Sequence, residues 1–167
     1  MKNIYILVIS LFIITTTARA QTGWVTHKGD ERISLKFPVE PKELTPGSFI
    51  AVDKDSVAYV FTIVDFKVVA NLDSAALAPI KTSPEFADQL KTGMKTSLPD
   101  VDLPDFAVGT FKGFTSYSSI GFDSKKKKYN FFMFIVGSKL YSVSTVSKEG
   151  ASAQGPANFV NSVIVSN

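Results

Sequence analysis

Few side chains in this sequence could perform acid–base or nucleophilic chemistry, because it has one histidine and no cysteine. A Ser-His-Asp mechanism would have to use His27 as its base, since the base must titrate near neutral pH. No G-x-S-x-G motif supplies a matching serine. We therefore expect His27 to be solvent-exposed or at a sheet edge, and we predict no catalytic and no cofactor-binding residue. The lack of cysteine also excludes thiol catalysis and thiolate zinc sites.

The densest acidic cluster is formed by Asp100, Asp102 and Asp105, which fall within six residues of one another. Several carboxylates together can hold a hard cation such as Ca²⁺. The cluster lacks the glycine and the distal glutamate of an EF-hand loop, so a solvated turn explains it better. The three aspartates are weak candidates for a metal site. A hydrolase that uses carboxylates alone, built on Asp65 or on this cluster, remains an alternative.

The strongest charge feature is a run of four lysines, here named the lysine tip: Lys125, Lys126, Lys127 and Lys128. It separates two apolar segments, so we expect it at the end of a hairpin. It could contact an anionic membrane, an acidic polysaccharide or an acidic partner. It could instead prevent the apolar residues 131–134 from associating, and we favour this second explanation. Trp24, the single tryptophan, could cap the edge of the core or present a binding surface.

Residues 1–20 have the features of a secretory signal peptide. An apolar run at residues 4–14 is followed by the small-residue motif Ala18-Arg19-Ala20. The run is shorter than the roughly 20 residues needed to cross a bilayer. We predict cleavage between Ala20 and Gln21, which gives a soluble periplasmic or secreted protein without a transmembrane segment. Without cysteine, the chain is not a lipoprotein.

Residues 21–167 have the length of a single domain with one core. Lys2 and Arg19 of the predicted leader supply two of the three net positive charges, so the remaining chain is nearly neutral. Nucleic-acid-binding proteins normally show a strong basic excess, and we therefore expect no nucleic-acid partner. The expected partner is a protein or an anionic component of the cell envelope.

Hydrophobic patterning predicts mostly strands in this domain. The predicted strands are residues 33–37, 49–52, 57–66, 106–114, 117–122, 129–136 and 139–146. Residues 57–66 and 129–136 are apolar at both odd and even positions, which is typical of strands covered on both faces. Gly137-Ser138 predicts a tight hairpin between the last two strands.

Helices are predicted between and after these strands. Ser83-Pro84-Glu85 is a helix start, and the following apolar residues are spaced four apart to about residue 95. A helical turn is expected within residues 72–80, a linker at 97–105, and a short helix from Pro156. The predicted fold class is α+β, with an antiparallel β-sheet covered by helices on both faces.

The order of these elements resembles that of the PsbP-like family, exported bacterial relatives of the photosystem II extrinsic subunit. The resemblance rests on residues 33–38, a mid-chain helix, residues 136–141 and residues 159–163. It implies an α-β-α sandwich and a role in binding or assembly in place of catalysis. No family metal or partner site matches residues of this sequence, so no site is carried over. Two alternatives to a binding or assembly module stay open, namely a small-molecule carrier and the carboxylate hydrolase.

Overall fold

The computed structural model describes residues 23–166, so the predicted signal peptide at residues 1–20 lies outside the described part. The strands are β1 (Val25–Lys28), β2 (Ile33–Phe37), β3 (Lys42–Thr45), β4 (Ser48–Val52), β5 (Ala58–Asp65), β6 (Val101–Asp102), β7 (Ala107–Phe111), β8 (Phe114–Asp123), β9 (Lys128–Val136), β10 (Lys139–Ser147) and β11 (Ile164–Val165). The helices are α2 (Phe66–Val69), α3 (Ser74–Leu77), α4 (Pro84–Ser97) and α5 (Gln154–Asn161). Within residues 23–166, no helix is both long and apolar enough to cross a membrane.

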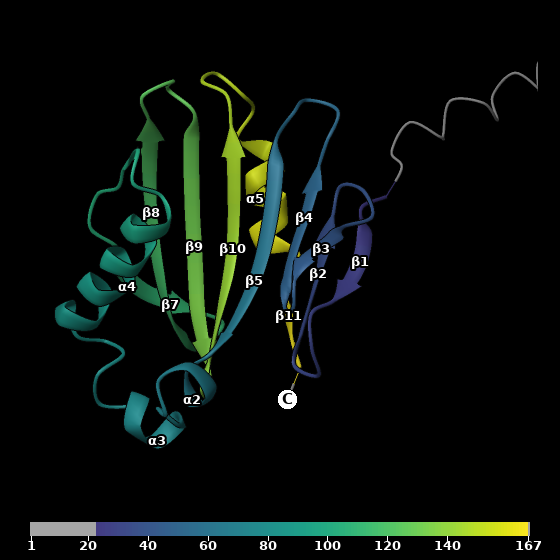
Figure 1. The fold of residues 1–167 in the computed structure, drawn as a ribbon. Coiled ribbons are helices and arrows are strands. Elements are labelled where there is room, and N and C mark those ends of the chain that lie inside the picture. The colour runs from purple at the N-terminus through teal and green to yellow at the C-terminus, as the bar shows by residue number, and fades with distance from the viewer. Residues whose placement is uncertain (1–22, 167) are drawn as a thin grey trace, which may run out of the picture.

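The strands form two antiparallel sheets. The large sheet has eight strands in the order β3-β4-β5-β10-β9-β8-β6, and β7 also pairs with β8 (Figure 1). The small sheet has three strands in the order β1-β2-β11. The hairpin of β9 and β10 occupies the centre of the large sheet and turns at Gly137-Ser138, as predicted.

Local sequence signals explain how several elements begin and end. The Ser83 side chain accepts the N–H of Phe86 and so caps α4, as predicted. The predicted strand at residues 106–114 is instead the start of a hairpin. Lys112 and Gly113 adopt positive φ angles of 51° and 84°, and this turn reverses the chain between β7 and β8.

Helix α4 lies over one face of the large sheet beside β8, and α3 lies near the lower end of the sheet in this view (Figure 1). Leu77 of α3 and Phe86 of α4 are buried in the same core cluster as Met133 of β9. Tyr117 of β8 is fully buried in the same cluster and donates its hydroxyl to the carbonyl of Lys81. Burial raises the pKa of Tyr117, so this hydroxyl stays protonated and acts as a donor.

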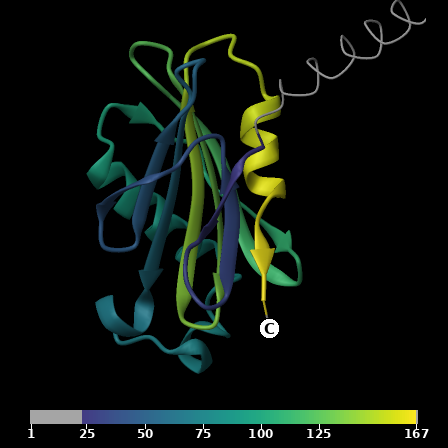
Figure 2. The same ribbon diagram turned by 90° about the vertical axis from the view of Figure 1, so that its right-hand side faces the viewer.

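The opposite face of the large sheet is covered by the small sheet together with α5, and Figure 2 shows α5 leading into β11 along this side. The rings buried between these layers are here named the aromatic layer: Phe37, Tyr59, Phe61, Phe134, Tyr141 and Phe159. The α+β fold with an antiparallel sheet is confirmed. The prediction that helices cover both faces of the sheet is not confirmed. On the second face, strands of the small sheet provide much of the cover, together with α5.

The two strands predicted to be covered on both faces differ from each other. Residues 133–136 of β9 are all buried, as expected for a central strand. In β5, Tyr59 and Phe61 are buried in the aromatic layer, whereas Val60 and Thr62 on the other face are half-buried. Helix α4 lies beside β8, so it leaves this side of β5 partly open.

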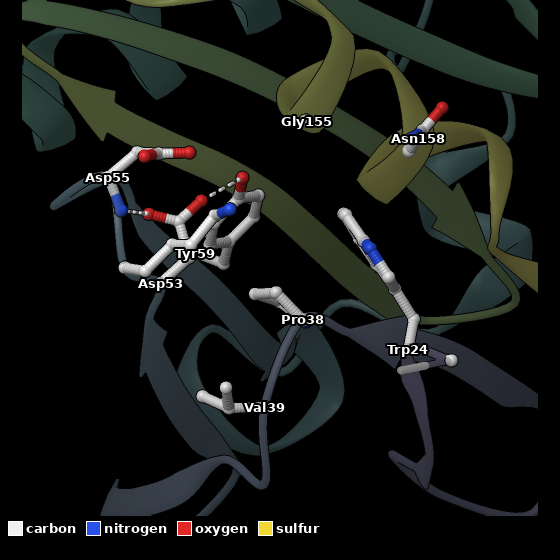
Figure 3. Close-up of a pocket in the computed structure, with 10 residues that line it drawn as sticks. Trp24, Pro38, Val39, Asp53, Asp55, Tyr59, Gly155 and Asn158 are labelled. Atoms are coloured by element: carbon white, nitrogen blue, oxygen red, sulfur yellow. Dashed lines mark hydrogen bonds between the residues drawn. The ribbon is translucent and has the colours of Figure 1, made fainter. Parts of the chain in front are cut away.

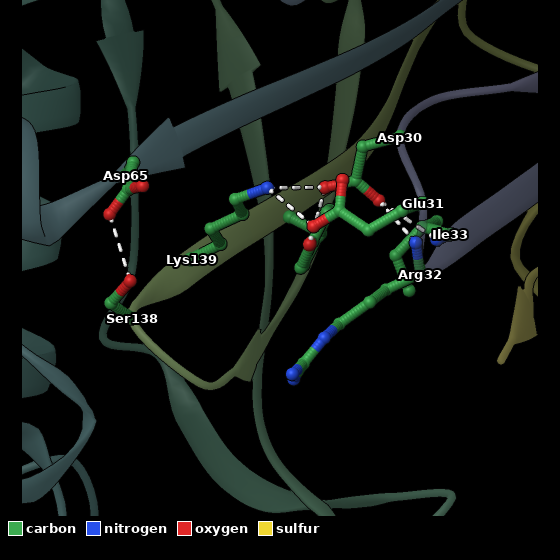
Figure 4. A network of polar contacts seen from close by, with 8 residues as sticks. Asp30, Glu31, Arg32, Ile33, Asp65, Ser138 and Lys139 are labelled. Atoms are coloured by element: carbon green, nitrogen blue, oxygen red, sulfur yellow. Dashed lines mark hydrogen bonds and ion pairs between the residues drawn. The ribbon is translucent and has the colours of Figure 1, made fainter. Parts of the chain in front are cut away.

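Asp30, in the loop between β1 and β2, ties the small sheet to β10 (Figure 4). Its Oδ2 atom lies 2.9 Å from the Lys139 Nζ and accepts the Tyr141 hydroxyl at 2.8 Å. Its Oδ1 atom accepts the backbone N–H groups of Arg32 and Ile33. Burial opposes ionisation of Asp30, but these hydrogen bonds outweigh it and hold the pKa of Asp30 below its usual range.

Replacing a ring of the aromatic layer should destabilise the protein far more than replacing an exposed ring. Phe134 is 0% exposed and Phe122 is 47% exposed. We expect Phe134→Ala to lower the free energy of unfolding by about 3–5 kcal/mol, because it leaves a cavity. Phe122→Ala should change it by less than about 0.5 kcal/mol. Urea unfolding followed by circular dichroism measures both, and equal losses would contradict the assignment of the core.

The hydrogen bonds and the ion pair of Asp30 should make the free energy of unfolding depend on pH in the acid range. A carboxyl whose folded-state pKa is lowered stabilises the fold above its unfolded pKa of about 3.9, and this contribution is lost as pH falls through the folded pKa. Asp30→Asn should therefore cost about 1–3 kcal/mol near neutral pH. The difference from the unsubstituted protein should shrink below about pH 4. Urea unfolding across this pH range measures the difference, and a constant difference would refute the role of the Asp30 charge.

Candidate functional site

An open cleft of about 700 Å³ lies beside α5 (Figure 3). It lies between the start of β1, the loop from β4 to β5, and the first turns of α5. Its lining residues are Gly23, Trp24, Pro38, Val39, Asp53, Lys54, Asp55, Tyr59, Gly155 and Asn158. We name it the Trp24 cleft. A second hollow of about 550 Å³ shares its Asp53, Asp55, Tyr59 and Gly155 and extends toward residues 148–152.

Trp24 forms one wall of the cleft and also covers the edge of the core. Its ring meets the Tyr59 ring edge-on, with 5.5 Å between the centroids, and lies 6.4 Å from that of Phe159. The indole is half-buried, so part of it faces the cleft. Trp24 therefore covers the edge of the core, while its role as a binding surface stays a prediction.

Tyr59 and Asp53 form the polar floor of the cleft. The Tyr59 hydroxyl donates to Oδ2 of Asp53 at 2.9 Å, while Oδ1 of Asp53 accepts the N–H groups of Asp55 and Val57. Burial, followed by the bond to Asp53, raises the pKa of Tyr59 and keeps its hydroxyl protonated. Both carboxylate oxygens of Asp53 are therefore used in holding the loop and the ring. The Asp55 carboxylate is exposed at the rim.

Gly155 allows α5 to approach the Tyr59 ring closely. A Cβ atom at position 155 would lie 2.2 Å from the Tyr59 hydroxyl oxygen, so a side chain there must displace the ring or the helix. The sequence pattern alone marks none of Tyr59, Asp53 and Gly155 as a site residue. The one local signal is the hydroxyl of Tyr59 within an apolar strand, since a buried tyrosine hydroxyl usually needs a partner.

The acidic candidates from the sequence do not gather into a metal site. Within residues 23–166, no group of three or more histidine, aspartate or glutamate side chains is arranged to hold a metal ion. Asp105 pairs with Lys91 at 2.5 Å, and the Asp105 side chain is 84% exposed. Asp102 is exposed in β6, and Asp100 is exposed just before this strand. Asp65 accepts the Ser138 hydroxyl and the N–H of Lys67, which caps α2.

His27 lies on β1, an edge strand of the small sheet, where it is half-buried. Its ring centroid is 4.2 Å from that of Phe49 and 5.7 Å from that of Phe37. The buried Nε2 atom has no hydrogen-bond partner among the described residues. Burial lowers the pKa of His27 more than the nearby Glu40 and Glu43 raise it. The edge position agrees with the sequence analysis, but the ring packs inward against aromatic residues.

Lys125, Lys126 and Lys127 lie in the turn between β8 and β9, as predicted, and Lys128 is the first residue of β9. Asp123 closes the turn by accepting the N–H groups of Lys125 and Lys127 on Oδ1. In Figure 1 this turn lies at the same end of the molecule as the loop from β4 to β5 and the loop from β10 to α5. The lysine tip and the Trp24 cleft therefore share one end of the fold.

Two glycines offer a matched test of the contact beneath the cleft. Gly155→Ala places a methyl group against the Tyr59 hydroxyl, and overpacking of this kind costs about 1–3 kcal/mol of unfolding free energy. Gly93→Ala lies in α4 with nothing within 4 Å of the new Cβ, and should stabilise the protein by about 0.5–1 kcal/mol. Thermal and urea unfolding compare them. A Gly155→Ala variant as stable as Gly93→Ala would show that α5 does not rest on Tyr59.

Comparison with solved structures identifies the fold. A solution structure of cyanobacterial PsbP (CyanoP) from Synechocystis sp. PCC 6803 is similar at a TM-score of 0.60 and 14% identity, over 91% of this chain and 98% of that chain. A crystal structure from Bacteroides thetaiotaomicron VPI-5482 is similar at a TM-score of 0.50 and 14% identity, over 88% of this chain. The chain spans about half (49%) of that longer protein. No family model and no curated protein matches the sequence. The protein therefore has a PsbP-like fold.

Proposed function

We propose that this protein is an exported, non-enzymatic binding module of the cell envelope that takes a ligand or a protruding group of a partner in the Trp24 cleft. The observation that carries the proposal is the cleft itself. Its volume of about 700 Å³ lies in the range of about 300–1,000 Å³ typical of ligand sites. An aromatic wall at Trp24 and an exposed carboxylate at Asp55 offer apolar contact and a hydrogen-bond acceptor to the same ligand.

The way the carboxylates are used favours binding over hydrolysis. A carboxylate hydrolase needs two reactive carboxyl groups about 5–9.5 Å apart. In the cleft, both oxygens of Asp53 accept structural hydrogen bonds, so Asp55 alone is available among these two. Asp65 likewise has a structural role, since its Oδ1 caps α2 and accepts the Ser138 hydroxyl.

Export is part of the proposal because of residues 1–20. A leader of this type, cleaved between Ala20 and Gln21, would deliver a cysteine-free chain to the periplasm or the outside. The absence of cysteine is compatible with an oxidising compartment, and it precludes lipid attachment at the cleavage site. The proposed partner is a protein or an anionic envelope component.

A small-molecule carrier is the second candidate, supported by the size of the cleft. A carrier usually encloses most of its ligand among apolar side chains. Here the lining mixes apolar residues with charged ones, and the cleft is open to solvent. This arrangement suits a group that projects from a larger partner better than a fully enclosed molecule.

Photo-crosslinking tests the cleft as the binding site. Benzoylphenylalanine is introduced at position 24, at position 158 or, as a control, at position 68, whose valine is 80% exposed on α2. We expect positions 24 and 158 to crosslink the same envelope component in intact cells, and position 68 not to crosslink it. Asp55→Asn should weaken that interaction about tenfold, the effect of losing one charge-assisted hydrogen bond.

Two outcomes would overturn the proposal. Crosslinking from positions 24 and 158 that does not exceed the control would show that the cleft is not the binding site. Turnover of an envelope glycan that is abolished by Asp55→Asn would make the protein an enzyme.

A further inference from the structure

Two large apolar side chains are exposed beside the lysine tip. Ile120 and Phe122 of β8 are each 47% exposed. They are two residues apart in one strand, so they project from the same face of the sheet. Phe122 lies directly opposite Lys128 in the pairing of β8 with β9. We name Ile120, Phe122 and the lysine tip together the basic-apolar corner.

The ammonium groups of this corner are largely free to meet another surface. Lys125, Lys126 and Lys127 are exposed in the turn. The one ion pair among the described residues that involves them joins Lys126 to Glu149 at 3.8 Å, with both side chains about 70% exposed or more. An exposed pair at that distance contributes little, so water and salt compete with it readily.

The position of β9 in the sheet argues against a purely protective role for the lysines. Residues 128–134 of β9 pair with β8 on one side, and residues 128–136 pair with β10 on the other. The edges of the large sheet are β3 and the β6–β7 side. The apolar residues 131–134 therefore present no free edge in the folded protein, and four lysines are not needed there to block association.

Acidic side chains also lie at this corner. Asp102 of β6 pairs directly with Phe122 of β8, so its exposed carboxylate is on the same face of the sheet as Phe122. Glu149 lies beside Lys126, and Asp123 accepts backbone N–H groups within the turn. The three exposed ammonium groups of Lys125, Lys126 and Lys127 are therefore opposed mainly by Asp102 and Glu149, which leaves the corner a small excess of positive charge.

We propose that the basic-apolar corner docks on an anionic phospholipid bilayer. The lysine ammonium groups would lie at the lipid phosphates, and Phe122 with Ile120 would enter the boundary between headgroups and acyl chains. A polysaccharide would offer anions but no hydrocarbon for the two apolar side chains. A bilayer offers both. The proposal is independent of the Trp24 cleft, although docking at this end would bring the cleft close to the membrane surface.

Vesicle sedimentation tests the proposal. The purified protein is mixed with vesicles of phosphatidylcholine alone or with added phosphatidylglycerol, at about 0.1 M salt, where surface charges still act over about 10 Å. We expect binding only to the anionic vesicles, weakened strongly by high salt. The main variant is Lys125→Gln/Lys126→Asn/Lys127→Gln. Asparagine is chosen at position 126 because that residue has a φ of 61°, which asparagine tolerates.

The triple variant should lower the partition coefficient on the order of 100-fold, about fivefold for each lysine. Phe122→Ser should lower it about tenfold. The matched control Lys42→Gln/Lys67→Gln/Lys95→Gln removes the same charge from other exposed positions and should change binding little. Val68→Ser is the corresponding control for exposed apolar surface.

Three results would overturn the proposal. The first is no binding to anionic vesicles. The second is an equal loss in the two triple variants, which would indicate unspecific attraction or attachment through another segment. The third is equal binding to a soluble polyanion such as dextran sulfate with no effect of Phe122→Ser, which would make the ligand a polymer. None of these results would bear on crosslinking through the Trp24 cleft.

Discussion

The structure depends on the packing of the aromatic layer between the large and the small sheet. The chain has no cysteine, so no disulfide can hold the two sheets together. Phe37 and Phe159 meet at 4.9 Å between centroids, which joins β2 to α5 above the large sheet. The layer also has two polar anchors, because Tyr141 is bound to Asp30 and Tyr59 to Asp53. A buried hydroxyl without a partner would be costly, and each anchor in turn fixes a loop at the rim of the layer.

The extent of this layer determines which surfaces remain available for binding. The small sheet and α5 cover the side of β5 and β10, and their edge against the loop from β4 to β5 forms the Trp24 cleft. They do not cover the outer part of β8, where Ile120 and Phe122 are exposed. Tyr59 belongs both to the aromatic layer and to the Trp24 cleft. Its ring is buried in the layer, and its hydroxyl lies at the floor of the cleft. Both proposed binding surfaces therefore follow from where the second layer ends.

Local signals in the sequence predicted most elements of the large sheet, but the features that require distant partners were not predicted. The start of α4 at Ser83 and the turn at Gly137-Ser138 depend on neighbouring residues, and both are confirmed. β11 has only two residues and exists because it pairs with β2, so its own pattern carries no signal. The turn at Lys112 was missed because a lysine rarely adopts positive φ. The cleft combines residues from positions 24, 59 and 155, and no local pattern brings such residues together.

Native-state hydrogen exchange tests most directly whether the aromatic layer joins the two sheets into one unit. Amides that open only by global unfolding share one free energy of opening, whereas a separately opening segment has a lower one. If the layer holds the sheets together, the central amides of β2 and of β10 will exchange with the same free energy of opening. That value will equal the free energy of unfolding measured with urea. If the β2 amides exchange at a clearly lower free energy than those of β10, the small sheet opens by itself and the aromatic layer does not have the role assigned to it.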